Sequence, residues 1–219
     1  MGGEVLMGSK SATQSSAVVN NFSCTKKKPE DFAVSFANQN THSVIEALDG
    51  QLITNKLPAQ TKLVTDNTVS DVENDVLKIV VVNRYKDAPV SKAFIKNIGL
   101  KKGAIASSVA HDSHNIVAVG VDDESICRAV NLIIEKKGGV SCVGNSDMIL
   151  PLPVGGLMSA EDGYKVASDY ATLDKAAKDL GSTLSAPFMT LSFMALLVIP
   201  HLKLSDLGIF DGDSFSLIS

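Results

Sequence analysis

The chain has 219 residues, 45% of them hydrophobic, and a formal net charge of −4, which allows one large domain or two small ones with a substantial core. This mildly acidic balance argues against the clustered basic face that nucleic-acid binding needs, and three cysteines without paired spacing argue against a disulfide framework. Because no secretory signal opens the chain and its longest apolar run, Phe193–Pro200, is far below the roughly 20 residues of a membrane span, we expect a cytoplasmic protein with no membrane partner.

The first third of the chain combines a polar lead-in with short strands. Residues 1–20 are small and polar, and we expect a flexible segment that precedes one domain over residues 21–219. Strands are predicted over Ser43–Leu48 and Gln51–Thr54, with Asp49-Gly50 as a hairpin turn. The β-branched run Val76–Val82 is typical of a central strand. A separate small β subdomain before about residue 72 stays open.

Further strands are expected from apolar runs that turn residues separate. They cover Phe94–Leu100 and Gly103–Val109, with a turn at Lys101–Gly103, then Ile116–Val121, and a hairpin of Val140–Val143 with Met148–Leu152. The last forty residues contain the strongly apolar stretch Pro187–Ile199 and the turn-rich stretch Asp206–Asp213.

Two helices are predicted from apolar residues at helical spacing. The first follows Asp122 or Asp123 as its cap, and Gly138 is placed to end it in the left-handed conformation. The second runs from about Ala160 to Leu180, with Ser159 as its cap. Strands first and mixed strands and helices later predict an α+β fold, a mixed β-sheet covered by two or more helices.

The most polar short segment is Ala110–Asn115, which we call the site loop. It places two imidazoles, a carboxylate, a hydroxyl and an amide between two apolar runs, where polar groups must be paired or hydrated. One interpretation is that the loop presents His111 or His114 for acid–base chemistry or as a ligand, with Asp112 fixing its tautomer. The alternative is a buried turn whose polar side chains bond the local backbone.

Other motifs support less chemistry. No HExxH motif and no further paired histidine completes a metal site. The two glycines of Pro151–Ser159 can cradle an anion before a helix, although a sharp strand-to-helix connection is the favoured interpretation. Pro187–Phe193 can line an apolar pocket or belong to the core. No nucleophile elbow is present, and Cys127 lies on the apolar side of a predicted helix.

Several long motifs resemble one known family. In order along the chain they are Asp71–Val82, Lys101–Ile116, Leu150–Pro153 with Gly156–Ser159, Pro187–Phe193 and Val198–Asp206. Over roughly residues 20–210 the chain resembles the C-terminal region of bacterial-type adenine deaminases. This resemblance implies that the full-length family member hydrolyses adenine to hypoxanthine and ammonia.

The resemblance also implies where the chemistry takes place. An amidohydrolase barrel precedes this region in the family, and a divalent metal pair there, iron or manganese, activates water. Such a barrel needs roughly 250 residues, for which this chain has no room. We therefore expect an accessory C-terminal domain that is inactive alone, binds no metal or other cofactor itself, and has the barrel as its partner in cis or in trans.

For such an accessory domain we expect the site loop to face the mouth of the barrel. His111, Asp112 and His114 are then the catalytic candidates, and Ser113 and Asn115 are the candidates for substrate binding. Two other functions stay open. A stand-alone binding module would associate with a barrel-containing partner or with itself through apolar surface. An independent enzyme would need a complete site, and only one polar cluster is visible.

Overall fold

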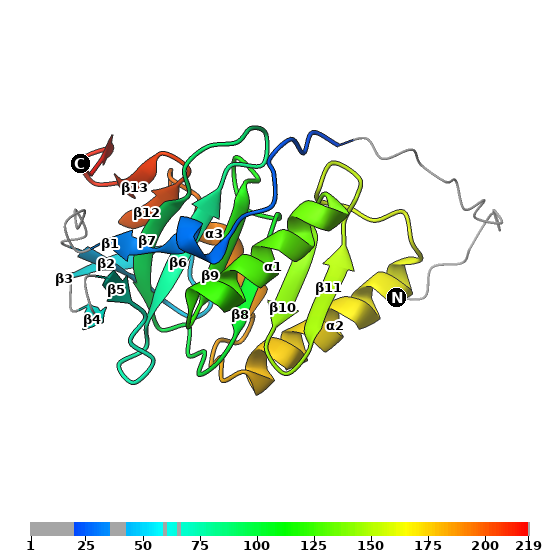
Figure 1. Cartoon of the computed structure of the whole chain (residues 1–219), viewed down its shortest axis with the longest axis horizontal. Helices are drawn as coiled ribbons and strands as arrows, with labels where there is room; N and C mark the ends of the chain where they lie inside the picture. The colour runs from blue at the N-terminus through cyan, green and yellow to red at the C-terminus, as the bar shows by residue number, and fades with distance from the viewer. Residues whose placement is uncertain (1–19, 36–42, 59–60, 65–66, 219) are drawn as a thin grey trace, which may run out of the picture.

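A mixed sheet of eight strands forms the centre of the protein in the computed structural model, which describes residues 20–35, 43–58, 61–64 and 67–218. Its strands are β2 (Ser43–Ala47), β3 (Thr54–Pro58), β6 (Val76–Val82), β7 (Ser91–Lys96), β8 (Ala104–Ser107), β9 (Ile116–Gly120), β10 (Gly139–Val143) and β11 (Asp147–Pro151). They lie in the order β11-β10-β8-β9-β6-β7-β2-β3 (Figure 1). All neighbours are antiparallel except β2 and β7, which run parallel.

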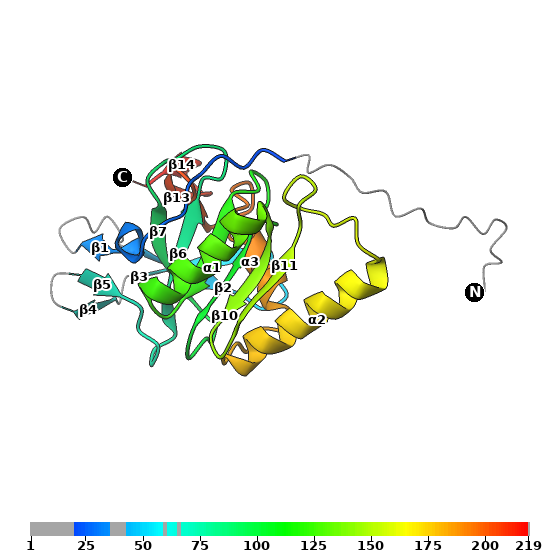
Figure 2. The same cartoon turned by 45° about the vertical axis from the view of Figure 1, so that its right-hand side comes forward.

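Helices cover both faces of this sheet, so the predicted α+β class is confirmed. The helix α1 (Asp123–Lys136) lies on one face, and α2 (Gly163–Asp179) and α3 (Pro187–Phe193) lie on the other (Figures 1 and 2). The continuous apolar run of β6 follows from this arrangement, because alternate side chains point to opposite faces. Leu77, Ile79 and Val81 pack on the α3 side, whereas Val80 and Val82 pack against α1.

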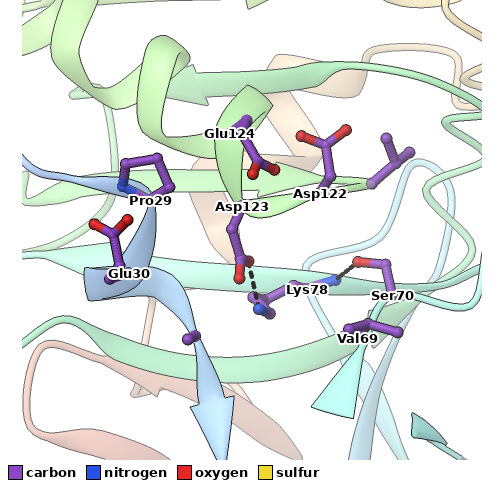
Figure 3. Close-up of a pocket in the computed structure, with 10 residues that line it drawn as sticks. Pro29, Glu30, Val69, Ser70, Lys78, Asp122, Asp123 and Glu124 are labelled. Carbon is purple, nitrogen blue, oxygen red and sulfur yellow. Dashed lines mark hydrogen bonds and ion pairs between the residues drawn. The ribbon is translucent and has the colours of Figure 1, made fainter. Parts of the chain in front are cut away.

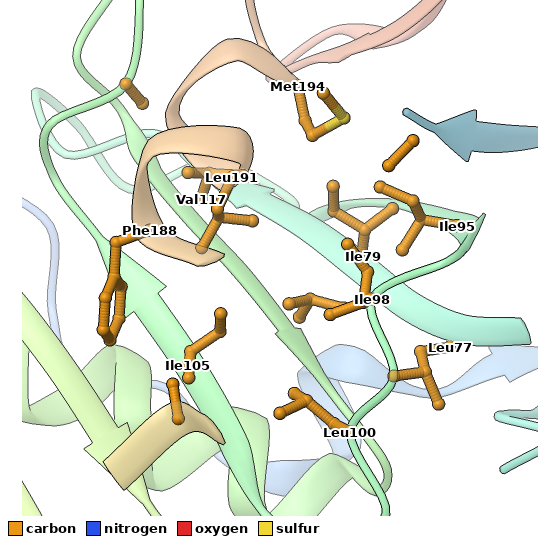
Figure 4. Packing of buried hydrophobic residues seen from close by; sticks show 14 of the residues in the cluster. Leu77, Ile79, Ile95, Ile98, Leu100, Ile105, Val117, Phe188, Leu191 and Met194 are labelled. Carbon is orange, nitrogen blue, oxygen red and sulfur yellow. The ribbon is translucent and has the colours of Figure 1, made fainter. Parts of the chain in front are cut away.

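The larger part of the core lies between the sheet and α3. Figure 4 shows Phe188 and Leu191 of α3 above Val117 and Ile105 of the sheet. Phe188 is 3% exposed and Leu191 fully buried, and burying one such side chain contributes about 1.5–3 kcal/mol. This packing fixes α3 on the sheet, and with it the end of the helix that reaches the site loop.

Two small antiparallel sheets and a short 3-10 helix, η1 (Pro29–Phe32), complete the described fold. One sheet consists of β1 (Val34–Ser35), β5 (Asn67–Val69) and β4 (Lys62–Val64), in that order, and the other of β12 (Leu202–Ser205), β13 (Gly208–Asp211) and β14 (Ser216–Leu217). The buried hydroxyl of Thr54 donates to the carbonyl of Leu202 at 2.8 Å, which ties β12 to β3. No helix of the described residues is long and apolar enough to cross a membrane.

Some predicted boundaries and pairings differ from the structure. The second strand of the first hairpin begins at Thr54, not at Gln51, whose amide instead donates to the carbonyl of Leu48 in the turn. Lys101–Gly103 connects two strands that are not neighbours, because β7 pairs with β6 and β2, and β8 with β9 and β10. The lead-in expected for residues 1–20 lies, except for Asn20, outside the described residues.

The helix caps also refine the prediction. Asp122 caps α1, since its carboxylate accepts from the amide of Ser125 at 2.6 Å. The left-handed residue at its end is Lys137, with φ 55°, one position before the expected Gly138. Ser159 does not cap α2: Asp162 does, because the hydroxyl of Ser159 accepts instead from the amide of Glu161.

The cap of α1 gives a first testable prediction. Asp122→Ala is expected to lower the free energy of unfolding by about 1 kcal/mol, since the amide of Ser125 loses its acceptor. Asp122→Asn keeps an acceptor oxygen and is expected to retain most of the stability. Urea denaturation of the three proteins measures the difference, and equal losses in both variants would contradict the capping role.

Candidate functional site

The site loop connects β8 to β9 at one end of the large sheet. Because β6, β8 and β11 all run antiparallel to their neighbours β9 and β10, their carboxyl ends lie at the same end of the sheet. The chain segments that follow these three strands therefore meet there. They are residues 83–87 after β6, the site loop after β8, and residues 152–158 after β11.

The two histidines of the site loop lie side by side, and His111 packs against α3. The imidazole of His111 stacks on the ring of Phe193, with ring centroids 5.0 Å apart, and meets the ring of His114 edge-on at 5.8 Å. The amide of His111 donates to the carbonyl of Ser192 at 3.0 Å, and the amide of His114 donates to the carbonyl of Ala110 at 2.7 Å. The backbone thus fixes the loop, and the two rings contact each other.

Four side chains of the site loop keep their hydrogen-bonding capacity. Within the described parts of the chain, the side chains of His111, Asp112, Ser113 and His114 have no hydrogen-bond partner, and the Nδ1 atom of His114 is also buried. Asp112 and Ser113 are exposed. A purely structural turn would use such groups to bond its own backbone, and these four side chains make no such bonds.

Asn115 differs from the other candidates. It is 2% exposed, and its Oδ1 atom accepts from the amide of Arg84 at 3.2 Å. The hydroxyl of Tyr85 donates to the carbonyl of Ser113 at 2.7 Å. The structure therefore places Asn115 behind the loop, together with two residues that the sequence did not single out. Their only signal in the sequence is that they follow a buried strand.

The surroundings of His114 favour its neutral form. Burial of the imidazole is the main cause that lowers its pKa below the ordinary 6.5, and the charges of His111 and Arg84 lower it further. The carboxylate of Asp112 acts in the opposite direction and raises this pKa. His114 is therefore suited to accept a proton near neutral pH, when a general base must be unprotonated.

The site loop does not form a metal centre by itself. Among the described residues, no group of three or more His, Cys, Asp and Glu side chains is arranged to hold a metal ion. His111, His114 and Asp112 equal in number the three protein ligands of many catalytic metal sites, but their side chains are not arranged around one ion. The residues present here do not fit a resident metal pair.

The glycine loop Pro151–Ser159 does not precede a helix directly. The helix α2 begins at Gly163, several residues later, so Gly155 and Gly156 do not lie at a helix N-terminus. An anion cradle of the kind considered from the sequence is not formed there. The loop is a strand-to-helix connection, which was the favoured interpretation.

An acidic pocket of about 330 Å³ lies on the face of the sheet that α1 covers (Figure 3). The acidic side chains in its wall are Glu30, Asp122, Asp123 and Glu124. Figure 3 shows the side chains of Lys78 and Asp123 pointing toward each other. The ammonium of Lys78 also donates to the carbonyl of Phe32 at 2.9 Å, so it joins β6, α1 and η1. These contacts are structural.

An apolar groove of about 420 Å³ lies beside the site loop. It is formed between the first half of α2, the helix α3 and strands β8, β10 and β11. The buried residues of α2, Leu173 and Ala177, both lie in its second half, and Figure 2 shows the first half leaving the sheet. Pro187–Phe193 thus does both things expected of it: Leu191 belongs to the core, and Met189, 53% exposed, lines the groove.

Comparison with known proteins identifies one family. The profile of the adenine deaminase C-terminal domain matches residues 51–216. An adenine deaminase of Methanosarcina acetivorans is 55% identical over 177 residues, which are 80% of this chain and 32% of that protein. An adenine deaminase of Borreliella burgdorferi is 47% identical over 91% of this chain and 37% of that protein. An adenine deaminase of Sulfurovum sp. is 50% identical over 99% of this chain and 40% of that protein. The chain thus spans about a third of the length of these relatives.

Proposed function

Because the chain belongs to the adenine deaminase C-terminal domain family, we propose that it is the accessory domain of an enzyme that converts adenine and water to hypoxanthine and ammonia. The proposal is supported by relatives that are full-length deaminases and contain this region as one part. The divalent metal, manganese or iron, that this reaction is expected to use would activate water in the preceding barrel. The described residues of this chain supply no site for it.

The observation that carries the proposal is the free hydrogen-bonding capacity of the site loop. His111, Asp112 and His114 gather two imidazoles and a carboxylate whose side chains have no hydrogen-bond partner in the described chain. Deamination needs proton transfer from the attacking water to the departing nitrogen, which a neutral imidazole can assist. We assign His114 to proton transfer, with His111 and Asp112 beside it as the other catalytic candidates.

The remaining candidates have different positions. Ser113 is exposed, and its hydroxyl is available to a purine nitrogen or to an ordered water. Asn115 was also a candidate for substrate binding, but its Oδ1 atom accepts from the backbone of Arg84. We propose that Asn115 serves the substrate indirectly, by fixing the loop that presents Ser113.

The apolar groove supports association with the preceding part of a deaminase. Asn20, where the described structure begins, donates through its side-chain amide to the carbonyl of Pro153 at 3.4 Å. The neighbouring Leu152 lines the groove, so the chain enters the described fold close to the rim of the groove. Ser192 lines the groove and accepts from the amide of His111, so one partner can cover both features.

Ammonia release and complex formation test this proposal together. The purified chain, assayed in the presence of manganese, is expected to release no ammonia from adenine, while the full-length Methanosarcina acetivorans deaminase serves as the active control. The chain is also expected to bind the preceding part of that deaminase, and Met189→Glu should weaken binding about tenfold or more by placing a charge in the groove. Met158→Glu is the matched control, because Met158 is also exposed but does not line the groove.

Each outcome of this experiment has a meaning. Ammonia release by the chain alone at a rate comparable to that of the control would overturn the accessory role. The stand-alone binding module would be favoured if the chain forms a dimer that Met189→Glu dissociates and if the chain does not bind the preceding part of the deaminase. Equal effects of Met189→Glu and Met158→Glu would contradict the groove as the seat of the partner.

A further inference from the structure

One buried arginine connects the three segments that meet at the site. The side chain of Arg84, which follows β6, donates from Nη1 to the carbonyl of Gly155 at 2.9 Å and from Nη2 to the hydroxyl of Tyr85 at 3.0 Å. That hydroxyl donates onward to the carbonyl of Ser113, and the amide of Arg84 donates to Asn115. Arg84 therefore holds both the site loop and the glycine loop after β11.

The glycine loop is shaped to admit this guanidinium. A Cβ atom on Gly156 would lie 1.8 Å from the Nη1 atom of Arg84, far inside van der Waals contact. The φ of Gly156 is +75°, a conformation that side chains rarely adopt. The hydroxyl of Ser108 donates to the carbonyl of Gly156 at 2.6 Å and fixes the turn from the other side. Any other residue at position 156 would displace the guanidinium.

The environment of Arg84 is costly for stability. Arg84 is 5% exposed, and within the described part of the chain no carboxylate lies within ion-pair distance of it. Its Nε atom is buried without a partner, and the rings of Phe22 and Tyr85 lie 5.4 and 4.8 Å from its guanidinium carbon. A buried charge without an ionic partner costs folding free energy, which indicates a role beyond stability.

We propose that Arg84 is the positioning residue of the site, an inference that rests on the proposed function. Position 156 must be glycine because only glycine leaves room for the guanidinium of Arg84. Arg84 holds the site loop from behind through Asn115 and through Tyr85. It touches none of the side chains that are free to meet substrate. Its role is to fix the direction in which the two imidazoles point.

The same charge acts on His114. The charged and titratable groups that act on this imidazole are Arg84, His111 and Asp112, while Phe193 and Ser192 of α3 carry no charge. Arg84 is one of the charges that lower the pKa of His114, after burial and His111. A guanidinium moved away from this imidazole would therefore raise the pKa of His114, and the change can be measured in the chain alone.

A matched pair of glycine variants tests the proposal. Gly155 and Gly156 have similar positive φ values, +65° and +75°, but a Cβ on Gly155 would meet nothing within 4 Å. Both alanine variants therefore carry the backbone strain, and only Gly156→Ala displaces Arg84. In NMR titrations of the histidine rings, Gly156→Ala is expected to raise the midpoint of His114, and Gly155→Ala to leave it unchanged.

Two substitutions of Arg84 keep the test decisive if Gly156→Ala fails to fold. Arg84→Gln removes the charge and is expected to raise the His114 midpoint, whereas Arg84→Lys keeps the charge but loses the forked bonds. Arg84→Lys should then change the amide resonances of Ser113 and Asn115 more than the midpoint. Equal shifts in both glycine variants, or an unchanged midpoint in Arg84→Gln, would overturn the proposal. This result is independent of turnover, so it is separable from a failure of the proposed function.

Discussion

His114→Ala, made in a full-length relative at the matching position, is expected to lower the turnover of adenine by about 100-fold or more. The loss of a positioned acid–base group typically costs a factor of 10² to 10⁴. His111→Ala should have a smaller effect, since it removes the ring that packs between Phe193 and His114 but leaves the second imidazole. Steady-state ammonia release, with metal content and circular dichroism measured on each variant, gives the comparison.

The pH profile adds a second readout for the same variant. The pKa of His114 is lowered from 6.5, mainly by burial, so its neutral form persists to lower pH than in a free histidine. If neutral His114 is the active form, activity is lost as the pH falls through this lowered pKa, and the acidic limb lies below about pH 6.5. His114→Ala should remove this limb from the residual activity.

A histidine elsewhere in the fold provides the control. His201 pairs with Asp213 near the small sheet of β12–β14, at 2.7 Å from Nδ1 to a carboxylate oxygen. His201→Ala is expected to leave turnover unchanged, because this imidazole lies in the bend before β12, outside the segments that form the site. Full turnover of the His111→Ala and His114→Ala variants, with metal and fold intact, would remove the site loop from the mechanism.

Local sequence patterns were sufficient for elements whose cause is local. The β-branched run Val76–Val82 predicted a central strand, and Asp122 or Asp123 with the apolar spacing after them predicted the start of α1, which Asp122 caps. The parallel pairing of β2 with β7 depends instead on segments about fifty residues apart. Turn chemistry cannot reveal such a pairing, which is why Lys101–Gly103 was interpreted as the turn between strands that turn out not to be neighbours.

The same division applies to the candidate site. The density of polar residues in the site loop was visible in the sequence, because all of them lie within six positions. The sequence did not show that Arg84 and Phe193 contact this loop. Arg84 precedes the loop by about thirty residues, and Phe193 follows it by about eighty. Only the tertiary fold brings the guanidinium behind the loop and the aromatic ring against His111. The role of Gly156 depends on this contact too.

The pair of Lys78 with Asp123 is expected to give the largest change in stability. Asp123→Ala should lower the free energy of unfolding by about 3 kcal/mol, because it leaves the ammonium of Lys78 buried with no ionic partner. The side chain of Lys78 is 2% exposed, and its remaining acceptor is the carbonyl of Phe32. Urea denaturation measures the loss. Asp169→Ala is the control, since its partner Lys165 is exposed and the midpoint should not move.

Replacing the lysine instead should cost much less, and this asymmetry identifies the cause. Lys78→Met keeps the apolar stem in the core and removes the charge, while Asp123 remains partly exposed at the start of α1, where a carboxylate is favourable. In the Lys78→Met background, Asp123→Ala should therefore lose most of its effect. If Asp123→Ala costs the same with and without Lys78, its effect comes from the helix terminus alone. A coupling of about 2 kcal/mol would instead show that the pair, and not either residue, holds η1 and α1 on the central strand.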